Sequence, residues 1–220
     1  MQATIGVSYG IYQSFHRILS AFDVEDHTPS LFIQRQFGSV QARFQYVFDY
    51  VKVGRSPYLI AHAFQPIFTF SEGNNKFTQF RYQNKDFQHG RFLFNSVRDG
   101  KNWLAGVTQY VFFADNTGYL RVGYTYDTDR TGGGSPFTAT PGDQTNADWA
   151  YKAHRLSAGL GLPPLLTVNL NLAFDYYRQE YDNPNSFSSA GTTRRKYNIF
   201  FFTGTLSRNI GDSLSLVLEY

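Results

Sequence analysis

The sequence predicts an all-β fold, an antiparallel up-and-down transmembrane β-barrel that forms one domain over residues 1–220. Apolar and polar side chains alternate along many segments, as in a strand with two different faces. Several of these segments exceed the five or six residues of a usual strand and reach the ~9 to 11 that a tilted strand needs to cross a bilayer. Charged residues make up only 17% of the chain and aromatic residues 18%, a balance that suits a lipid-facing surface.

The clearest strand pair covers 149–162 and 166–181. In the second arm, one parity is apolar throughout: Leu166, Val168, Leu170, Leu172, Phe174 and Tyr176. The other parity is mostly polar, with Thr167, Asn169, Asn171, Asp175 and Gln179. The two arms are joined at Pro163-Pro164, which predicts a tight hairpin there.

Alternation places the other strands in order along the chain. They are expected at 3–13, 31–37, 40–53, 58–70, 77–87, 103–114, 119–127, 197–207 and from 214 onward. Residues 14–30 are predicted to form a long polar connection before a short strand. The faces of 58–70 stay unassigned because Pro66 and other residues interrupt both parities, and Pro66 also lacks a ladder donor. The total is about eleven strands.

The predicted connections are short at one end of the sheet and mostly long at the other. The short ones are Gly38, 71–75, 114–118, Pro163-Pro164 and 209–212, and at the long-loop end only 54–57 is short. Bacterial outer-membrane barrels have this asymmetry, with short turns in the periplasm and longer loops outside the cell. Trp103 and Trp149 begin strands at the long-loop end. Aromatic girdles are therefore predicted there, with Tyr50, Tyr126, Tyr176 and Tyr177, and at the short-turn end, with Phe70, Phe77, Phe113 and Tyr119.

Composition excludes several other classes of protein. The net charge of +3 is spread along the chain without a basic recognition motif, so nucleic acid is not an expected partner. The absence of Cys excludes disulfides and thiolate metal sites, and no cofactor is predicted. No apolar run approaches the ~18 residues of a membrane helix. If the chain spans a membrane, it does so with strands.

The ends of the sequence suggest a fragment. The first ten residues, MQATIGVSYG, do not form a secretory signal, which an outer-membrane barrel needs. Single-chain bacterial barrels have an even number of strands, whereas about eleven are predicted here. We therefore expect a closing C-terminal strand outside this sequence, which would give twelve, unless 31–37 is not a strand. Either the sequence is that of a mature chain, or its front end with the signal is missing.

Five motifs resemble those of one barrel family. They are RDGKNW at 98–103, QYVFF with GYLRVGYTYD at 109–127, HRLSAGLGLP at 154–163, YYRQEYDNP at 176–184 and LSRNIGDSLSLVLEY at 206–220. The chain thus resembles the C-terminal barrel of tetratricopeptide-repeat outer-membrane proteins, including the surface lipoprotein assembly modifier type. The resemblance implies a bacterial outer-membrane location and a periplasmic repeat domain in the same protein. It also implies export or surface display of a macromolecule, with a lipoprotein or a polysaccharide as cargo.

Parity assigns side chains to two faces of the predicted barrel. The polar parity would line the lumen with Arg43, Asp49, Arg81, Lys85, Arg121, Asp127, Arg155, Asn169, Asn171 and Asp175. The apolar parity would face membrane lipid with Phe44, Tyr46, Phe48, Leu156, Leu160, Val168, Leu170, Leu172 and Phe174. The mixed charges of the lumen could form a cross-barrel network of ion pairs or a mildly anion-favouring path.

No catalytic or metal-binding residues are predicted. Asp23, Glu25, Asp26 and His27 form an acidic loop cluster, but it lacks the glycine-punctuated spacing of a calcium loop. His154 and Ser157 are three apart on a strand and would point to opposite faces. Asp86 with His89 is an acid-base candidate without a nucleophile.

Three functions stay open at this point. The first is a non-enzymatic outer-membrane barrel for export or surface assembly. The second is an outer-membrane enzyme, which a cluster of Ser, His and an acid near one girdle would support. The third is a soluble ligand-binding barrel with the apolar parity inside, although so many large apolar side chains would overfill a small soluble barrel.

Overall fold

The fold comes from a computed structural model, which describes residues 3–16, 20–89, 99–131, 149–165, 167–184, 194–210 and 214–219. Eleven strands form one sheet in chain order, and consecutive strands are antiparallel. The strands are β1 (Ala3–Ser14), β2 (Val24–Phe37), β3 (Val40–Val53), β4 (Ser56–Ser71), β5 (Lys76–His89), β6 (Gly100–Phe113), β7 (Gly118–Thr131), β8 (Tyr151–Leu165), β9 (Val168–Pro184), β10 (Arg194–Ile210) and β11 (Leu214–Glu219). A short 3-10 helix, η1 (Ser20–Phe22), precedes β2. The predicted all-β, up-and-down architecture is confirmed.

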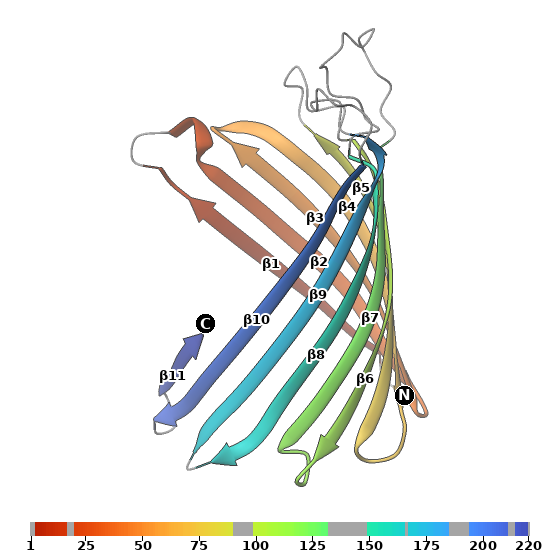
Figure 1. The fold of residues 1–220 in the computed structure, drawn as a ribbon, viewed down its shortest axis with the longest axis vertical. Coiled ribbons are helices and arrows are strands. Elements are labelled where there is room, and N and C mark those ends of the chain that lie inside the picture. Colours follow the sequence, from red (N-terminus) through yellow and green to blue (C-terminus); the bar gives the residue numbers. More distant parts are fainter. Residues whose placement is uncertain are drawn as a thin grey trace, which may run out of the picture.

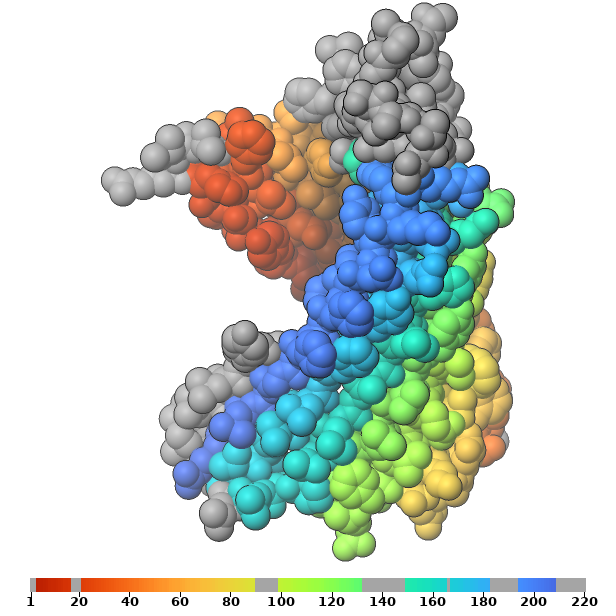
Figure 2. All heavy atoms as spheres, in the orientation of Figure 1, coloured from red at the N-terminus to blue at the C-terminus, as the bar shows by residue number. Residues whose placement is uncertain are grey.

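The sheet is strongly curved. Figure 1 shows β1 and β2 behind β9 and β10, so that the strands follow the wall of an incomplete cylinder. Among the described residues, β1 pairs only with β2 and β11 only with β10. The space-filling view shows the atoms of β1 and β10 apart along one side (Figure 2). The described sheet is therefore not closed.

The strands are long. β2 to β10 each contain 14 to 17 residues. The predicted strand at 40–53 has the observed bounds, but others extend farther toward the long connections: β7 continues to Thr131 and β10 begins at Arg194. The added residues are polar on both faces, so the apolar alternation that predicts a strand is absent from them.

The predicted polar connection at 14–30 is wrong in its second half. β2 begins at Val24 and is as long as its neighbours, so the acidic cluster, apart from Asp23, lies on a strand. Alternation failed here because residues 24–30 are almost all polar. The fold accommodates Pro29, which has no N–H, because the pairing of β2 with β3 is interrupted at Thr28 and Pro29 and resumes in the same register at Ser30.

The predicted hairpin turn at Pro163-Pro164 is also wrong. Both prolines belong to the end of β8, where the pairing with β9 shifts register between Leu162 and Leu165. The connection is 166–167, and Thr167 has a positive φ of 68°. Proline favours turns, but it is also tolerated at strand irregularities where no ladder donor is needed.

The asymmetry of the connections is confirmed. At one end the strands are joined by 38–39, 72–75, 114–117, 166–167 and 211–213, and at the other by 15–23, 54–55, 90–99, 132–150 and 185–193. The exception at 54–55 is a two-residue hairpin, in which Gly54 and Arg55 both have positive φ. The short turns lie at the lower end of the view in Figure 1.

The described residues do not form an apolar core. Their buried apolar side chains are all alanines: Ala42, Ala61, Ala63 and Ala153. Large apolar side chains are exposed instead, up to 79% for Val7 and 70% for Phe202. In the described part of the chain, no helix is long and apolar enough to cross a membrane.

Candidate functional site

The pairing register sorts the strand side chains onto two faces. All ten residues predicted to line a lumen lie on one face, here called the inner face. All nine residues predicted to face lipid lie on the opposite, outer face. The exposed large apolar side chains of β2 to β9 also lie on the outer face, apart from Leu165 beside the turn. Local alternation was thus sufficient to separate the faces of the strands on which it was clear, whereas the faces of 58–70 follow only from the register with β3.

Asp49 and Lys85 form an ion pair across an intervening strand on the inner face. Lys85 Nζ donates to Asp49 Oδ2 at 2.7 Å, although β3 and β5 are separated by β4. The β4 residues opposite them are Ala61 and Ala63, which are 0% and 3% exposed. These small side chains leave space for the ion pair above them. A bond between second-neighbour strands is consistent with a concave inner face.

Asp127 accepts hydrogen bonds from three strands. Asn102 Nδ2 on β6 donates at 2.6 Å, and the hydroxyls of Tyr151 on β8 and Tyr177 on β9 each donate at 3.3 Å. Ala153 lies opposite Asp127 on β8 and is fully buried. As with Asp49 and Lys85, the small alanine on the intervening strand leaves space for a contact between second-neighbour strands, here from Tyr177 on β9 to Asp127 on β7.

Glutamines extend this polar network toward β4. Gln65 Nε2 donates to Gln83 Oε1 at 2.9 Å, and Gln83 Nε2 donates to Asn102 Oδ1 at 3.3 Å. Because Asn102 donates to Asp127 in turn, hydrogen bonds connect β4 through to β9. The glutamines are absent from the predicted lumen residues, which are charged apart from Asn169 and Asn171. Gln83 has the same parity as Arg81 and Lys85 on β5, and this pattern in the sequence could have placed it on the inner face.

Three arginines line one cavity of about 270 Å³ on the inner face. Arg81, Arg121 and Arg155 come from β5, β7 and β8, and the carboxylates of Asp127 and Asp175 line the same cavity. Arg155 Nε donates to Asp175 Oδ1 at 2.8 Å. Three guanidinium groups against two carboxylates leave a surplus positive charge. The cavity therefore favours anionic groups such as carboxylates or phosphates.

The other predicted lumen residues lie apart from this cavity. Arg43 stacks on the ring of Phe32, 3.9 Å from its centroid, and donates to Gln45 at 3.0 Å. Asn169 and Asn171 lie near the start of β9, toward the short-turn end. Of the ten residues, five therefore share the arginine cavity and two form the Asp49–Lys85 pair.

A repeated pair of His and Tyr occupies the outer face. Each histidine bonds through Nδ1 to the hydroxyl of a tyrosine on the preceding strand: Tyr9–His27, Tyr46–His62 at 2.6 Å and Tyr124–His154 at 2.7 Å. Each tyrosine lies two residues from the one directly opposite the histidine. The pairing gives each Nδ1 atom a hydrogen-bond partner on a face that is mostly apolar along the middle of the strands. Sequence analysis missed it because the partners lie on different strands.

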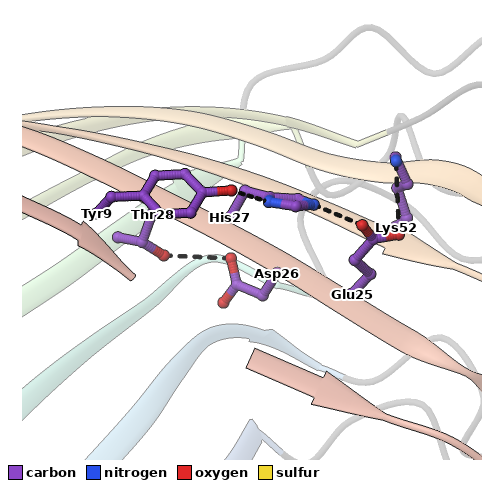
Figure 3. A network of polar contacts seen from close by, with 6 residues as sticks. All are labelled: Tyr9, Glu25, Asp26, His27, Thr28 and Lys52. Atoms are coloured by element: carbon purple, nitrogen blue, oxygen red, sulfur yellow. Dashed lines mark hydrogen bonds and ion pairs between the residues drawn. The ribbon is translucent and has the colours of Figure 1, made fainter. Parts of the chain in front are cut away.

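The acidic cluster is divided between the two faces of β2 (Figure 3). His27 Nε2 and Glu25 Oε1 lie 2.7 Å apart, and Lys52 Nζ is 3.5 Å from Glu25 Oε2, on the side that also carries Tyr9. Asp26 projects to the other side and accepts from Thr28 Oγ1 at 3.3 Å. Within the described residues, no group of three or more His, Cys, Asp or Glu could hold a metal ion.

The acid-base candidates are separated as well. His154 bonds to Tyr124 on the outer face, whereas Ser157 lines the inner arginine cavity. Asp86 is 3.9 Å from Lys101 on the outer face, and His89 lines a different hollow on the inner face. Neither pair can share a proton directly.

The aromatic residues assigned to girdles do not all lie on one face. Tyr50, Tyr126, Tyr176, Phe70 and Phe113 are on the outer face, as a lipid-facing girdle requires. Tyr177, Phe77 and Tyr119 are on the inner face, so their assignment to lipid-facing girdles is wrong. Phe77 stacks there on Tyr110, with ring centroids 4.3 Å apart. These three residues lie near the strand ends, as predicted, but they share the parity of the polar residues and therefore point to the inner face.

Comparison of the chain with protein-family models, with curated proteins and with solved structures finds no match. The resemblance to the tetratricopeptide-repeat barrels stays a prediction from the motifs. A function must therefore be inferred from the chemistry of the two faces.

Proposed function

We propose that this chain is the membrane-spanning domain of a bacterial outer-membrane β-barrel protein, with the outer face in lipid and the inner face around a hydrated lumen. The supporting observation is the exposure of large apolar side chains on the outer face beside a polar, hydrogen-bonded inner face. A water-soluble protein rarely exposes such extensive apolar surface. In a bilayer the same side chains lose contact with water.

The height of the apolar band supports this assignment. On the outer face of β9 the apolar row runs from Val168 to Tyr176, and Arg178 and Glu180 follow. Eight residue steps at ~3.3 Å span ~26 Å along the strand, which a tilt of ~40° reduces to ~20 Å across the membrane. Outer-membrane barrels have an apolar band ~25 Å tall.

The connections suggest the orientation. Short turns face the periplasm and longer loops face outside in barrels of this kind. Trp103, near the long-loop end of β6, lies on the outer face, where Arg130 stacks over its ring at 4.9 Å. Tryptophan and a cation at this level are typical of a membrane interface.

Closure is a requirement of the proposal. Lipid cannot satisfy the backbone groups of a free strand edge, so barrels that span a bilayer have no open edges. The backbone groups along the unpaired edges of β1, β10 and β11 must therefore form hydrogen bonds in the membrane, either with one another or with further strands.

We assign the barrel a non-enzymatic role in export or surface display of a lipoprotein or polysaccharide, together with a periplasmic repeat domain. This assignment depends on the motif resemblance. The arginine cavity adds one chemical expectation, because a cargo that passes the inner face would meet surplus positive charge. Anionic segments of a cargo would be favoured there.

Single-tryptophan variants test the membrane assignment. The chain has two tryptophans, Trp103 on the outer face and Trp149 beside Tyr151 and Tyr181 in an inner hollow. W149F and W103F each leave one reporter, to be refolded in vesicles that contain brominated phospholipid. We expect strong quenching of Trp103 and weak quenching of Trp149, with a heat-modifiable band for both variants.

The opposite result would favour a soluble carrier. A β-rich monomer that folds in buffer without detergent, and whose Trp103 is not quenched in the presence of brominated vesicles, would contradict the membrane assignment. Folding in vesicles with Trp149 quenched more than Trp103 would show that the faces are reversed.

A further inference from the structure

The outer face of β8, β9 and β10 changes abruptly from polar to apolar. Its two cross-strand rows nearest the long-loop end contain Lys152, Glu180 and Lys196, and then His154, Arg178 and Asn198. The next three rows are apolar, apart from the Tyr176 hydroxyl: Leu156, Tyr176 and Phe200, then Ala158, Phe174 and Phe202, then Leu160, Leu172 and Gly204. Tyr176 donates to Asn198 at 2.8 Å, across the boundary. This is the profile of a membrane interface.

The polar rows carry more cations than carboxylates. Five of these six residues, all except Asn198, line a hollow of about 460 Å³ together with Tyr181, Asp182 and Arg194. The hollow contains four basic side chains, Lys152, Arg178, Arg194 and Lys196, and two carboxylates, Glu180 and Asp182. Glu180 is shared, because Arg178 Nε donates to it at 2.9 Å and Lys196 Nζ lies 3.7 Å away. Two positive charges are therefore not balanced by a carboxylate within the hollow. We call these residues the cationic hollow.

An apolar hollow lies on the same strands, closer to the middle of the band. It has a volume of about 330 Å³, and its lining includes Leu160, Leu172, Phe174 and Phe202. Phe174 precedes Arg178 by four residues on β9, or ~13 Å along the strand. Charged groups and apolar groups are thus arranged in the order in which a lipid presents its headgroup and acyl chains. Figure 2 shows β8 to β10 side by side on the near side of the molecule.

We infer that this face binds a phosphate-bearing lipid of the surrounding leaflet, with the phosphate in the cationic hollow and acyl chains along the apolar hollow. The inference rests on the proposed membrane function. Arginine and lysine are the usual partners of phosphate groups, and basic clusters at the membrane surface recognise anionic headgroups. A neutral headgroup would leave the surplus charge without a partner.

A second charged surface on the outer face provides the contrast. At the same end of β5 to β7, Lys101 and Arg130 share a hollow with Asp86 and Asp99. Lys101 Nζ is 3.9 Å from Asp86, and Arg130 stacks over Trp103. Two cations meet two carboxylates, so no positive charge is left for a headgroup. Removing one of these cations is therefore a matched control.

Lipid titration of the folded chain tests the inference. The full chain is refolded in neutral detergent, checked for heat modifiability, and titrated with bisphosphorylated lipid A while the bound fraction is measured by native mass spectrometry. We expect K152Q/K196Q to bind roughly 20-fold more weakly than the wild type, because each basic residue near an anionic lipid surface contributes about fivefold. K101Q should bind within twofold of the wild type. Dephosphorylated lipid A should bind the wild type as weakly as lipid A binds K152Q/K196Q.

Other outcomes separate the alternatives. Equal binding by the wild type and K152Q/K196Q, or an equal loss in K101Q, would overturn the lipid site while leaving the barrel assignment intact. Displacement of lipid A by millimolar inorganic phosphate would also overturn it, because the hollow would then recognise phosphate without its lipid. A chain that folds only in the absence of detergent would overturn the proposed function and the lipid site together.

Discussion

An arginine placed on the outer face of β9 should destabilise the fold according to its depth in the apolar band. Leu172 lies four residues from Val168 and four from Tyr176, the two ends of the outer apolar row. At ~3.3 Å per residue and a tilt of ~40°, Leu172 is ~10 Å from each end and therefore central. Leu170 is only ~5 Å from the short-turn end of the row. Asn171 lies between the two in sequence but on the inner face.

The expected costs follow from these depths. Leu172→Arg should lower the free energy of unfolding by about 2 to 4 kcal/mol, the cost of a guanidinium near the bilayer midplane. Leu170→Arg should cost about 1 to 2 kcal/mol, because the penalty falls toward zero at the interface. Asn171→Arg should stay within about 0.5 kcal/mol, because its side chain extends into water.

Equilibrium unfolding by urea in phosphatidylcholine vesicles measures these costs, with tryptophan fluorescence and the heat-modifiable band as independent signals. A cost for Asn171→Arg as large as that for Leu172→Arg would refute the assignment of the faces. Equal costs at Leu170 and Leu172 would refute the placement of the band along β9.

Three further predictions concern the inner face and the strand contacts. Asp127→Ala should cost about 1 to 3 kcal/mol in the same unfolding assay, because three donors lose their acceptor; a change below 0.5 kcal/mol would mean that water replaces it fully. A double-mutant cycle of Asp49→Asn and Lys85→Met should give a coupling energy of about 1 kcal/mol that declines in ~1 M salt, and no coupling would show that the ion pair contributes nothing. Gly100→Ala should cost about 1 to 3 kcal/mol, because its Cβ would lie 2.3 Å from a backbone oxygen of β7, whereas Gly204→Ala, with its nearest neighbour at 3.8 Å, is the neutral control.

Much of the fold could be predicted from the sequence because the direction of a strand side chain is a local property. Successive residues point to opposite faces, so Arg81 and Phe80 could be assigned without knowledge of their neighbours. The strand order needed only that consecutive strands pair as antiparallel neighbours, whether the connection between them is short or long. The prediction failed at the start of β2, where polar residues replace the alternation of apolar and polar side chains. It also failed at Pro163-Pro164, where the prolines suggested a turn but belong to β8.

The contacts within each face were decided by the tertiary structure. Asp127 and Tyr177 are 50 residues apart. Two successive registers place Asp127 opposite the buried Ala153, and Ala153 opposite Gln179, which is two residues from Tyr177 on β9. Register depends on the pairing of whole strands, and a shift of one residue would move every side chain to the other face. The sequence alone therefore determined which residues share a face on the strands with clear alternation, but not on 58–70. Only the folded sheet determined that three arginines share one cavity, and that four cations gather above an apolar hollow on β8 to β10, because those neighbours belong to different strands.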